Sequence, residues 1–571
     1  MKATRLLFLD FETYYDDEYS LRKMPTPNYI LDPRWETICC AVKEDKGRSH
    51  VVEGPDFVDF LANYDPEETT TVTFNSLFDN SILAWRYGFI PHRMIDTMGM
   101  ARALRGHLLP SASLDSVARH LGLGEKGHAL AKMKGIHHAE MITEPALWAE
   151  FKEYAIQDVE LNAAIFYKLY PEFPLAEQKL MDLVLRCTIE PSFTTDRNML
   201  CDHLAEVKEQ KQELLDRAGA DKKSLMSTAK FKVALEDLGV KVEMKTSPKG
   251  KEIPAFAKSD DFMQTLLESE DARVQTLAMA RLGFKSTLEE TRGLKLLSIA
   301  SLPWLKAGLL ATSMPVPLRY GGAHTHRLSG EWGMNMQNLP TARGSKGKSK
   351  LRSSLTAPKG HLVSAADLGQ IEARLTAWIC GDMDLLKQFA DNLDPYAILA
   401  ELIFGYKVDR KVQILEGFIG KTGVLGLGYG AGIDKFYNMV IIMARAAGID
   451  LGDMWTIELA ATTVNAYRKA RRPIVQGWYK LDRIIATAWV GKSGPAKFGP
   501  CLISKGRIDL PNGLSLNYAD PKWDSERQEF TYRYGKRTHH IYGAKMLENI
   551  VQALARIVVM NAALTAGSPP A

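Results

Sequence analysis

The chain has 571 residues, of which 46% are hydrophobic and 25% are charged, and its formal net charge is +4. This composition excludes a disordered or fibrous protein and indicates a globular protein of three or four domains. Because the net charge is small, it neither requires nor excludes a nucleic-acid partner. Evidence for such a partner must come from local clusters of residues.

The cysteine content and the apolar segments indicate the compartment. The chain has six cysteines and none of them forms a CxxC pair, so neither a structural zinc site nor a disulfide framework is expected. The N-terminal segment lacks the apolar length and cleavage site of a signal peptide. We find no segment that approaches the roughly 20 apolar residues of a membrane span. We therefore expect a protein of the reducing cytoplasm, without a membrane.

Strand-like and helix-like patterns alternate in the first 170 residues. The segments 5–13, 37–44 and 69–75 are rich in apolar and β-branched residues and predict strands. The segments 114–122 and 146–170 have helical periodicity. This alternation predicts an α/β domain.

Two acids lie close together in the first predicted strand, at Asp10 and Glu12. The two-residue period of a strand places both carboxylates on one face, where they repel unless a cation lies between them. Oxygen ligands of this kind suit Mg²⁺ or Mn²⁺. The plain alternative is an acid pair on an exposed sheet edge.

Two further pairs follow, Asn75 with Asp79 and Tyr154 with Asp158, and the second pair lies one helical turn apart. Each pair alone is a weak signal, and a Tyr and an Asp at this spacing are usually a pair on a helix surface. In this order, D-x-E, N-x-x-x-D and Y-x-x-x-D resemble the exonuclease motifs of the DEDD superfamily, in its tyrosine-bearing branch. The resemblance implies an RNase H-like fold with a mixed sheet and flanking helices. It also implies two metal ions on the four acids, a water oriented by Tyr154, and 3′-to-5′ cleavage of single-stranded 3′ ends. The four acids are Asp10, Glu12, Asp79 and Asp158.

From about residue 175 to 310 the pattern becomes helical, with long amphipathic runs at 202–220 and 260–300. A lysine-rich loop at 245–256 interrupts them. A solvated helical bundle is the plain interpretation of this region.

The segment 361–378 predicts a strand that runs directly into a helix, with Asp367 where the strand ends. An acid at this position is usually a helix N-cap. The alternative is a metal ligand, which would need partners elsewhere in the chain.

A glycine-rich helix follows, on which Lys421, Leu425 and Tyr429 are spaced four apart and share one face. The sequence GKT within it suggests a phosphate-binding P-loop, but that motif needs a glycine at position 415, where this chain has Leu415. The segments around Asp367 and Lys421 are similar to motifs A and B of the family-A DNA polymerases, those like DNA polymerase I. The resemblance departs from the family at Leu425, where an aromatic residue is usual, and at Gly417, where an arginine is frequent.

The resemblance to the family-A polymerases implies a role for each matching residue. Asp367 and the carbonyl of Leu368 would bind two catalytic Mg²⁺ (or Mn²⁺) ions. The dNTP would be contacted by Gln370, Glu372, Lys421, Leu425 and Tyr429, with Glu372 against the sugar and Lys421 on the triphosphate. Primer–template DNA would be contacted by Arg327, Gln337, Asn338, Arg352 and Gln552, largely in the minor groove, where readout is insensitive to sequence.

The resemblance covers nearly the whole chain and is greatest to phage-type versions. It implies an exonuclease domain at 1–172, a helical thumb and connecting region at 173–310, and a right-hand polymerase fold with an α+β palm and helical fingers. The palm would comprise 311–377 and 501–571, and the fingers 378–500. The helix predicted at about 542–563 would precede motif C, a hairpin that carries the family's second metal-binding acid.

No Asp or Glu follows Glu548, so an acidic hairpin of the motif C type is not found in this sequence. Either the product is shortened, or a separate polypeptide supplies the hairpin, or polymerisation is impaired. We therefore hold three hypotheses: a monomeric replicative polymerase with proofreading, encoded by a phage and acting in the host cytoplasm; a 3′-to-5′ exonuclease whose polymerase half mainly binds primer–template; and a non-catalytic DNA-binding subunit. The intact set of exonuclease motifs argues against the third.

Overall fold

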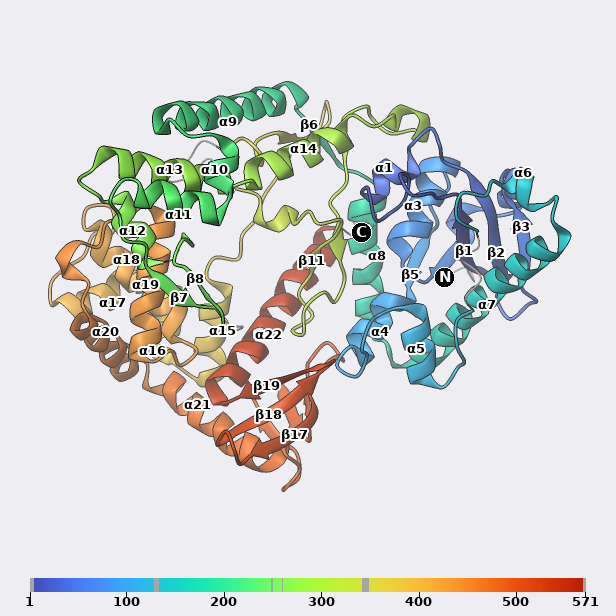
Figure 1. The fold of residues 1–571 in the computed structure, drawn as a ribbon. Coiled ribbons are helices and arrows are strands. Elements are labelled where there is room, and N and C mark those ends of the chain that lie inside the picture. Colours follow the sequence, from blue (N-terminus) through green and yellow to red (C-terminus); the bar gives the residue numbers. More distant parts are fainter. Residues whose placement is uncertain (1–4, 128–132, 248–249, 259, 341–348, 568–571) are drawn as a thin grey trace.

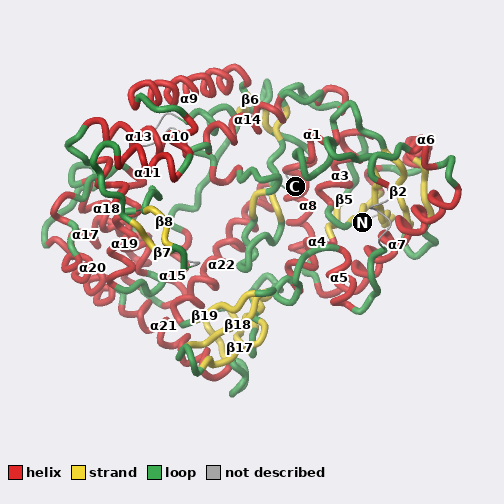
Figure 2. The backbone as a smooth tube through the Cα atoms, in the orientation of Figure 1, coloured by secondary structure: helices red, strands yellow, loops and turns green. Residues whose placement is uncertain are grey.

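The computed structural model describes residues 5–127, 133–247, 250–258, 260–340 and 349–567. Figure 1 shows an N-terminal lobe built on a sheet and a larger, mainly helical lobe, with the helix α22 (Gly543–Ala566) running between them. Figure 2 shows that strands concentrate in the N-terminal lobe and in a small sheet below α22.

The N-terminal lobe contains a mixed sheet in the order β3-β2-β1-β4-β5. The central strand β1 pairs antiparallel with β2 and parallel with β4. β2 is buried along almost its whole length, as its continuous apolar run predicts for an internal strand. The strands are β1 (Arg5–Thr13), β2 (Thr37–Glu44), β3 (His50–Glu53), β4 (Thr69–Thr73) and β5 (Arg93–Asp96).

Helices flank this sheet. The long helix α7 packs against β1 and β2, and α8 packs against α3 and β5. Side-chain caps define several helix starts, as at Ser113, whose Oγ accepts the backbone N–H of Ser116 at 3.3 Å. The helices are α1 (Thr26–Ile30), α2 (Phe57–Leu61), α3 (Ser76–Tyr87), α4 (Thr97–Arg105), α5 (Leu114–Leu121), α6 (His138–Met141), α7 (Pro145–Leu169) and α8 (Leu175–Ile189). The predicted mixed sheet with flanking helices is therefore present.

The middle of the chain is helical, as predicted, but the segment 245–256 is not a plain loop. Its ends pair as an antiparallel hairpin, β7 (Met244–Thr246) with β8 (Glu252–Pro254), and the backbone N–H of Ser247 donates to the carbonyl of Lys251 at 2.8 Å where the strands end. Residues 248–249 lie outside the described part. The helices here are α9 (Arg197–Ala218), α10 (Lys222–Met226), α11 (Thr228–Glu236), α12 (Asp261–Leu267), α13 (Ala272–Lys285) and α14 (Leu288–Ala300).

Short strands connect this helical region to the next part of the chain. β6 (Phe193–Thr195) lies between β9 (Ser313–Met314) and β12 (Leu355–Thr356), so strands from distant segments share one small sheet. A second pair consists of β10 (Leu318–Arg319) and β11 (Ser329–Gly330).

The last described part of the chain adds seven α-helices and two antiparallel sheets before α22. The hairpin predicted around Gly513 is confirmed, since β15 and β16 pair and Gly513 has a φ of +84°. The helices are α15 (Ile371–Cys380), α16 (Met383–Ala390), α17 (Pro395–Phe404), α18 (Ile414–Leu427), α19 (Ile433–Ala447), α20 (Ile457–Ala470) and α21 (Arg472–Ile484). The sheets comprise β13 (Ala496–Phe498), β14 (Cys501–Ser504), β15 (Arg507–Asp509) and β16 (Ser515–Asn517), and β17 (Ala519–Asp524), β18 (Glu529–Tyr534) and β19 (Arg537–Ile541).

The helix predicted at 542–563 is present as α22, but it corrects one expectation. By length and composition, Gly543–Gly567 is long and apolar enough to cross a membrane, contrary to our reading of the sequence. One such helix is weak evidence for a membrane span. α22 packs against α21, α15 and α8, and its Arg556 forms a buried ion pair with Glu177 of α8 at 2.5 Å. These are the contacts of a core helix.

Candidate functional site

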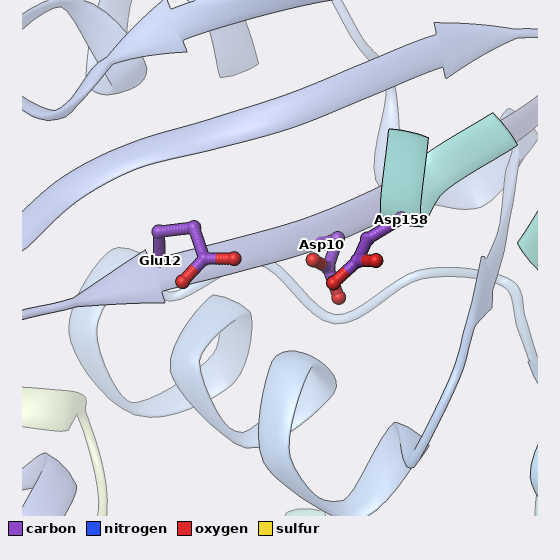
Figure 3. Close-up of side chains that lie close together, drawn as sticks. All are labelled: Asp10, Glu12 and Asp158. Carbon is purple, nitrogen blue, oxygen red and sulfur yellow. The ribbon is translucent and has the colours of Figure 1, made fainter. Parts of the chain in front are cut away.

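Three of the predicted metal ligands meet in the N-terminal lobe. Asp10 and Glu12 project from β1 and Asp158 from α7, and one ligand oxygen from each lies within 4.8 Å of the others (Figure 3). Glu12 and Asp158 are buried, with Asp158 only 1% exposed. In the described part of the chain, no other group of three His, Cys, Asp or Glu side chains is as close.

The fourth acid adjoins this group. Asp79 lies in the first turn of α3, is buried, and its Oδ1 accepts the backbone N–H of Phe11 at 3.1 Å. Asn75 directly precedes α3 with a φ of +74°. The bond to Phe11 places Asp79 beside the strand that carries Asp10 and Glu12, although Asp79 is not one of the acids whose oxygens all lie within 4.8 Å of one another. We call the three close acids and the adjoining Asp79 the acid cluster.

Burial and mutual repulsion dominate the electrostatics of the cluster. Burial, and then the charge of Asp158, raises the pKa of Asp10 to about 7. Burial and the charge of Asp10 raise the pKa of Glu12 and of Asp79 well above their usual values. Carboxylates in this environment ionise together only when a cation compensates them.

The cluster fits a divalent metal ion. Its members are oxygen donors, as Mg²⁺ and Mn²⁺ prefer. Oδ1 of Asp158 is buried without a hydrogen-bond partner, which is unusual for a buried carboxylate and leaves a lone pair for a ligand.

Tyr154 lies one turn before Asp158 on α7 and is buried. Burial and the neighbouring acids raise the pKa of its hydroxyl above the usual value, so it stays protonated and able to donate a hydrogen bond. Its ring lies 5.0 Å from Nζ of Lys126.

Sequence reasoning missed Lys126, whose ammonium forms an ion pair with Oδ2 of Asp158. No periodicity or spacing distinguishes this lysine, because it lies in a loop between α5 and α6. Only the packing of that loop against α7 brings it to the acids.

The region of Asp367 differs from the prediction. Residues 361–368 form no strand, and the segment is exposed, with Leu362 95% and Val363 53% exposed. A strand forms only where a neighbour pairs with its backbone, and no strand in the described residues pairs with this segment. The prediction of a strand running directly into the helix was therefore wrong, although α15 begins at Ile371 as expected.

Asp367 itself is exposed, and the described residues place no carboxylate cluster around it. Leu368 is 41% exposed. Gln370 precedes α15 with a φ of +58°. The described residues thus do not complete a metal site at Asp367.

Other predicted nucleotide-site residues do come together. Glu372 and Tyr429 line one small cavity together with Leu425. Burial raises the pKa of Tyr429, with further contributions from Glu372 and Glu548. Tyr429 follows the end of α18 at Leu427, so it does not continue the helix face of Lys421 and Leu425 as predicted. Gly428 is the C-cap of α18, and Gly430 turns the chain after Tyr429 with a φ of +77°.

The predicted DNA-contacting residues lie in two places. Arg327 forms an ion pair with Glu372 at 3.4 Å, and Gln552 on α22 accepts a hydrogen bond from Thr325 at 3.3 Å. Gln552 also donates to Glu548 at 3.2 Å, a carboxylate to which sequence reasoning gave no role, although the four-residue spacing on a helix indicates the contact.

The second place is a short turn that presents polar side chains. Gln337 and Asn338 are exposed there. Arg352 donates to the carbonyl of Leu339 at 3.0 Å, and Arg292 of α14 donates to that of Asn338 at 2.5 Å. Two arginines therefore hold the backbone of this turn.

Comparison with known proteins shows similarity to one family of polymerases. A family model described as DNA polymerase family A matches residues 197–449. A DNA polymerase from Bacillus phage SP02 is 26% identical over 462 residues, which are 72% of this chain and 66% of that protein. The chain is therefore similar to family-A DNA polymerases in its middle segment, and to a phage DNA polymerase over most of its length.

Bacterial polymerases match over shorter segments. DNA polymerase I from Chloroflexus aurantiacus is 37% identical over 109 residues, 19% of this chain and 11% of that protein. The enzyme from Treponema pallidum is 36% identical over 126 residues, 22% of this chain and 12% of that protein. The chain thus spans slightly less than two thirds of its phage relative and about a tenth of these bacterial ones.

A solved structure shows the same fold over most of the chain. The match is to the POL domain of Pol1 from M. smegmatis, in complex with DNA primer-template and dNTP. It has a TM-score of 0.58 and 16% identity, and it covers 98% of this chain and 82% of that one. At this identity the likeness shows the family-A polymerase fold alone.

Proposed function

We propose that the protein is a template-directed DNA polymerase with a 3′-to-5′ proofreading exonuclease, acting in the replication of a phage genome. The observation that carries the polymerase assignment is the combination of the family match with the family-A fold across the chain. The buried acid cluster supports the exonuclease.

The domain arrangement that we propose follows the predicted boundaries. Residues 1–172 form the exonuclease domain of RNase H-like type, and 173–310 the thumb and connecting region. Residues 311–377 and 501–571 form the palm, and 378–500 the fingers. This division is supported by the mixed sheet within residues 1–172 and by the helices within 173–310 and 378–500.

In the exonuclease, each side chain has a distinct task. Asp10, Glu12, Asp79 and Asp158 would hold Mg²⁺ or Mn²⁺. Bound divalent ions would supply the Lewis acidity that activates water and stabilises the leaving 3′ oxygen. Tyr154, protonated at neutral pH, donates a hydrogen bond that orients the attacking water.

In the polymerase, the primer 3′-hydroxyl would attack the α-phosphate of a dNTP, and pyrophosphate would leave. Lys421, exposed on α18, is available to the triphosphate as a point charge. Glu372 and Tyr429 form the wall against the sugar and the templating base, with Leu425 where an aromatic residue is usual. Gln370 is a further proposed contact to the dNTP, and the carbonyl of Leu368 is a proposed metal ligand beside Asp367.

Primer–template DNA is the proposed partner, with single-stranded 3′ ends as the substrate of the exonuclease. Arg327, Gln337, Asn338, Arg352 and Gln552 are the proposed contacts. Asp367 is assigned to nucleotidyl transfer by resemblance alone, and a separate polypeptide is one proposed source of the acid that would complete its site. We propose that the chain is otherwise monomeric and acts in the host cytoplasm.

A second candidate function is an exonuclease whose polymerase half mainly binds primer–template. The exposed, unpaired segment 361–368 favours it, because Asp367 is held by no sheet and has no carboxylate partner in the described residues.

Primer extension decides between the two. With Mg²⁺ and dNTPs we expect the native chain to extend a primer, Asp367→Ala to abolish extension while degradation of single strands persists, and Asp10→Ala to do the reverse. Absence of extension by the native chain at any concentration would refute the polymerase and favour the second function. Full nuclease activity in Asp10→Ala would refute the exonuclease assignment.

A further inference from the structure

Lys126 lies inside the acid cluster, although nothing in the proposed chemistry requires a lysine there. Its ammonium contacts Oδ2 of Asp158, and it lies 5.0 Å from the centre of the Tyr154 ring. We infer that Lys126 is a tethered cation that occupies the cluster in the absence of metal, and that a divalent ion must displace it to bind. This inference rests on the proposed exonuclease function of the cluster.

The contact is built by the fold of the loop that carries the lysine. The backbone N–H of Lys126 donates to Oδ1 of Asp115 at 3.1 Å. Next to it, the carbonyl of Glu125 accepts a hydrogen bond from Gln157 of α7 at 2.7 Å, and the Glu125 carboxylate pairs with Arg119 at 2.6 Å. Bonds to α5 and α7 therefore fix the root of the lysine side chain beside Asp158.

A glycine allows this close approach. A Cβ at Gly127 would lie 3.0 Å from the side-chain oxygen of Gln157 and 3.1 Å from the ring of Tyr154. Both distances are shorter than ordinary van der Waals contacts. The loop thus packs directly on the two turns of α7 that carry Tyr154 and Asp158, and the position of Lys126 follows from this packing.

Charge explains why a cation belongs in this place. Four acids gather in a buried site, and their ionised forms repel one another. The charge of Lys126 lowers the pKa of Asp10, Glu12 and Asp158, so the ammonium partly compensates the cluster. A divalent ion held by the same carboxylates compensates them more fully and repels an ammonium in contact with Asp158, so the two cations compete.

The lysine is able to leave. Its side chain is 31% exposed, whereas that of Asp158 is 1% exposed, so the ammonium lies at the mouth of the cluster and the acid at its base. A flexible four-carbon stem lets the ammonium move into solvent while the backbone stays fixed. Displacement therefore needs a change of rotamer and no movement of the loop.

The first test measures Mn²⁺ binding to the full-length chain by calorimetry. Lys126→Met keeps the length of the side chain and removes its charge. This variant should bind Mn²⁺ at least about tenfold more tightly than the native chain, because the ammonium that competes with the metal ion is gone. Lys179→Met, which removes an exposed charge on α8, is the matched control and should bind as the native chain does.

The binding site is assigned with Asp10→Asn combined with Asp158→Asn. If the native chain and this double variant bind Mn²⁺ equally, or if neither binds it, the proposed metal site itself is wrong. If Mn²⁺ binds there but Lys126→Met has unchanged or weaker affinity, the metal site stands and the competing role of Lys126 is overturned.

A second test uses the native chain and so does not depend on the folding of a variant. Lys126 is labelled with an amine-reactive reagent and quantified by mass spectrometry in EDTA and in Mn²⁺. Mn²⁺ should increase the labelling rate of Lys126 several-fold and leave that of Lys179 unchanged. Equal rates for Lys126 under both conditions would overturn the displacement.

Discussion

The acids Asp10 and Asp367 each follow an apolar segment in the sequence, yet the structure treats them differently. Asp10 lies on β1, which is paired on both sides, and the residue before it, Leu9, is fully buried. Asp367 follows a segment that no described strand pairs, with Leu362 almost fully exposed. A carboxylate becomes part of an acid cluster when the backbone beneath it is held and other acids converge on it.

The largest effect that would test this comparison is the loss of a carboxylate from the complete cluster. Asp158→Asn should reduce degradation of single-stranded DNA by about 10²–10³-fold or more, the scale expected when one electrostatic contact to the reacting group is lost. Gel-based nuclease assays measure this effect. Asp384→Asn, at a largely exposed carboxylate on α16, is the control and should retain full activity.

The next largest effect is expected from a mutation in the ion pair that joins the two lobes. Arg556 of α22 pairs with Glu177 of α8, and both side chains are buried. Arg556→Met leaves a buried carboxylate unpaired and should lower the free energy of unfolding by about 3–5 kcal/mol. Chemical denaturation measures this change. The surface pair Arg533–Asp520 is the matched control, and Arg533→Met should cost about 0–1 kcal/mol.

The same pair should be sensitive to pH. Burial alone would raise the pKa of Glu177, but the hydrogen bonds and charge of Arg556 hold it below 4.5. The contribution of the Glu177 carboxylate to the free energy of unfolding is therefore present above pH 4.5. It is lost as the pH falls through the lower pKa that Glu177 has in the folded protein. The difference between native and Arg556→Met proteins should shrink there, and a constant difference would contradict the assignment.

The acid cluster should show the opposite pH dependence in EDTA. Burial and the charge of Asp158 raise the pKa of Asp10 from its ordinary value of 3.8 to about 7, so between these pH values the folded state holds a proton that the unfolded chain has lost. This contribution to stability is fully present below pH 3.8 and is lost as the pH rises to 7. Denaturation in EDTA should show that the native chain loses more stability over this range than Asp10→Asn does. Equal slopes would contradict it.

The smallest effect is expected at the unpaired segment. Leu362→Ser should change the free energy of unfolding by less than about 0.5 kcal/mol, because the side chain is already in water. Leu9→Ala, at the matching place before Asp10, should cost about 2–5 kcal/mol. Chemical denaturation of both variants measures the contrast, and a large cost at Leu362 would show that the segment is packed.

The closeness of Asp10, Glu12 and Asp158 agrees with the prediction from the sequence, whose signals are local. The spacing of Asp10 and Glu12 follows the period of a strand, and that of Tyr154 and Asp158 follows the period of a helix. Lys126 could not be predicted, since it lies in a loop and 32 residues before the acid that it contacts.

The strand expected before Asp367 failed for a related reason. An apolar segment can form a strand, but only if a neighbouring strand supplies hydrogen-bond partners for its backbone. The helix α15 formed as predicted because the hydrogen bonds of a helix are made within the segment itself.

The sequence alone thus determined the alternation of strands and helices in the first 170 residues, the helical middle, the hairpin at Gly513 and the positions of the acids. Tertiary structure decided which acids meet, that a lysine joins them, and that Asp367 stays apart. The physical reason is that periodicity orders only near neighbours, whereas charge compensation and sheet pairing depend on residues that packing brings together from distant parts of the chain.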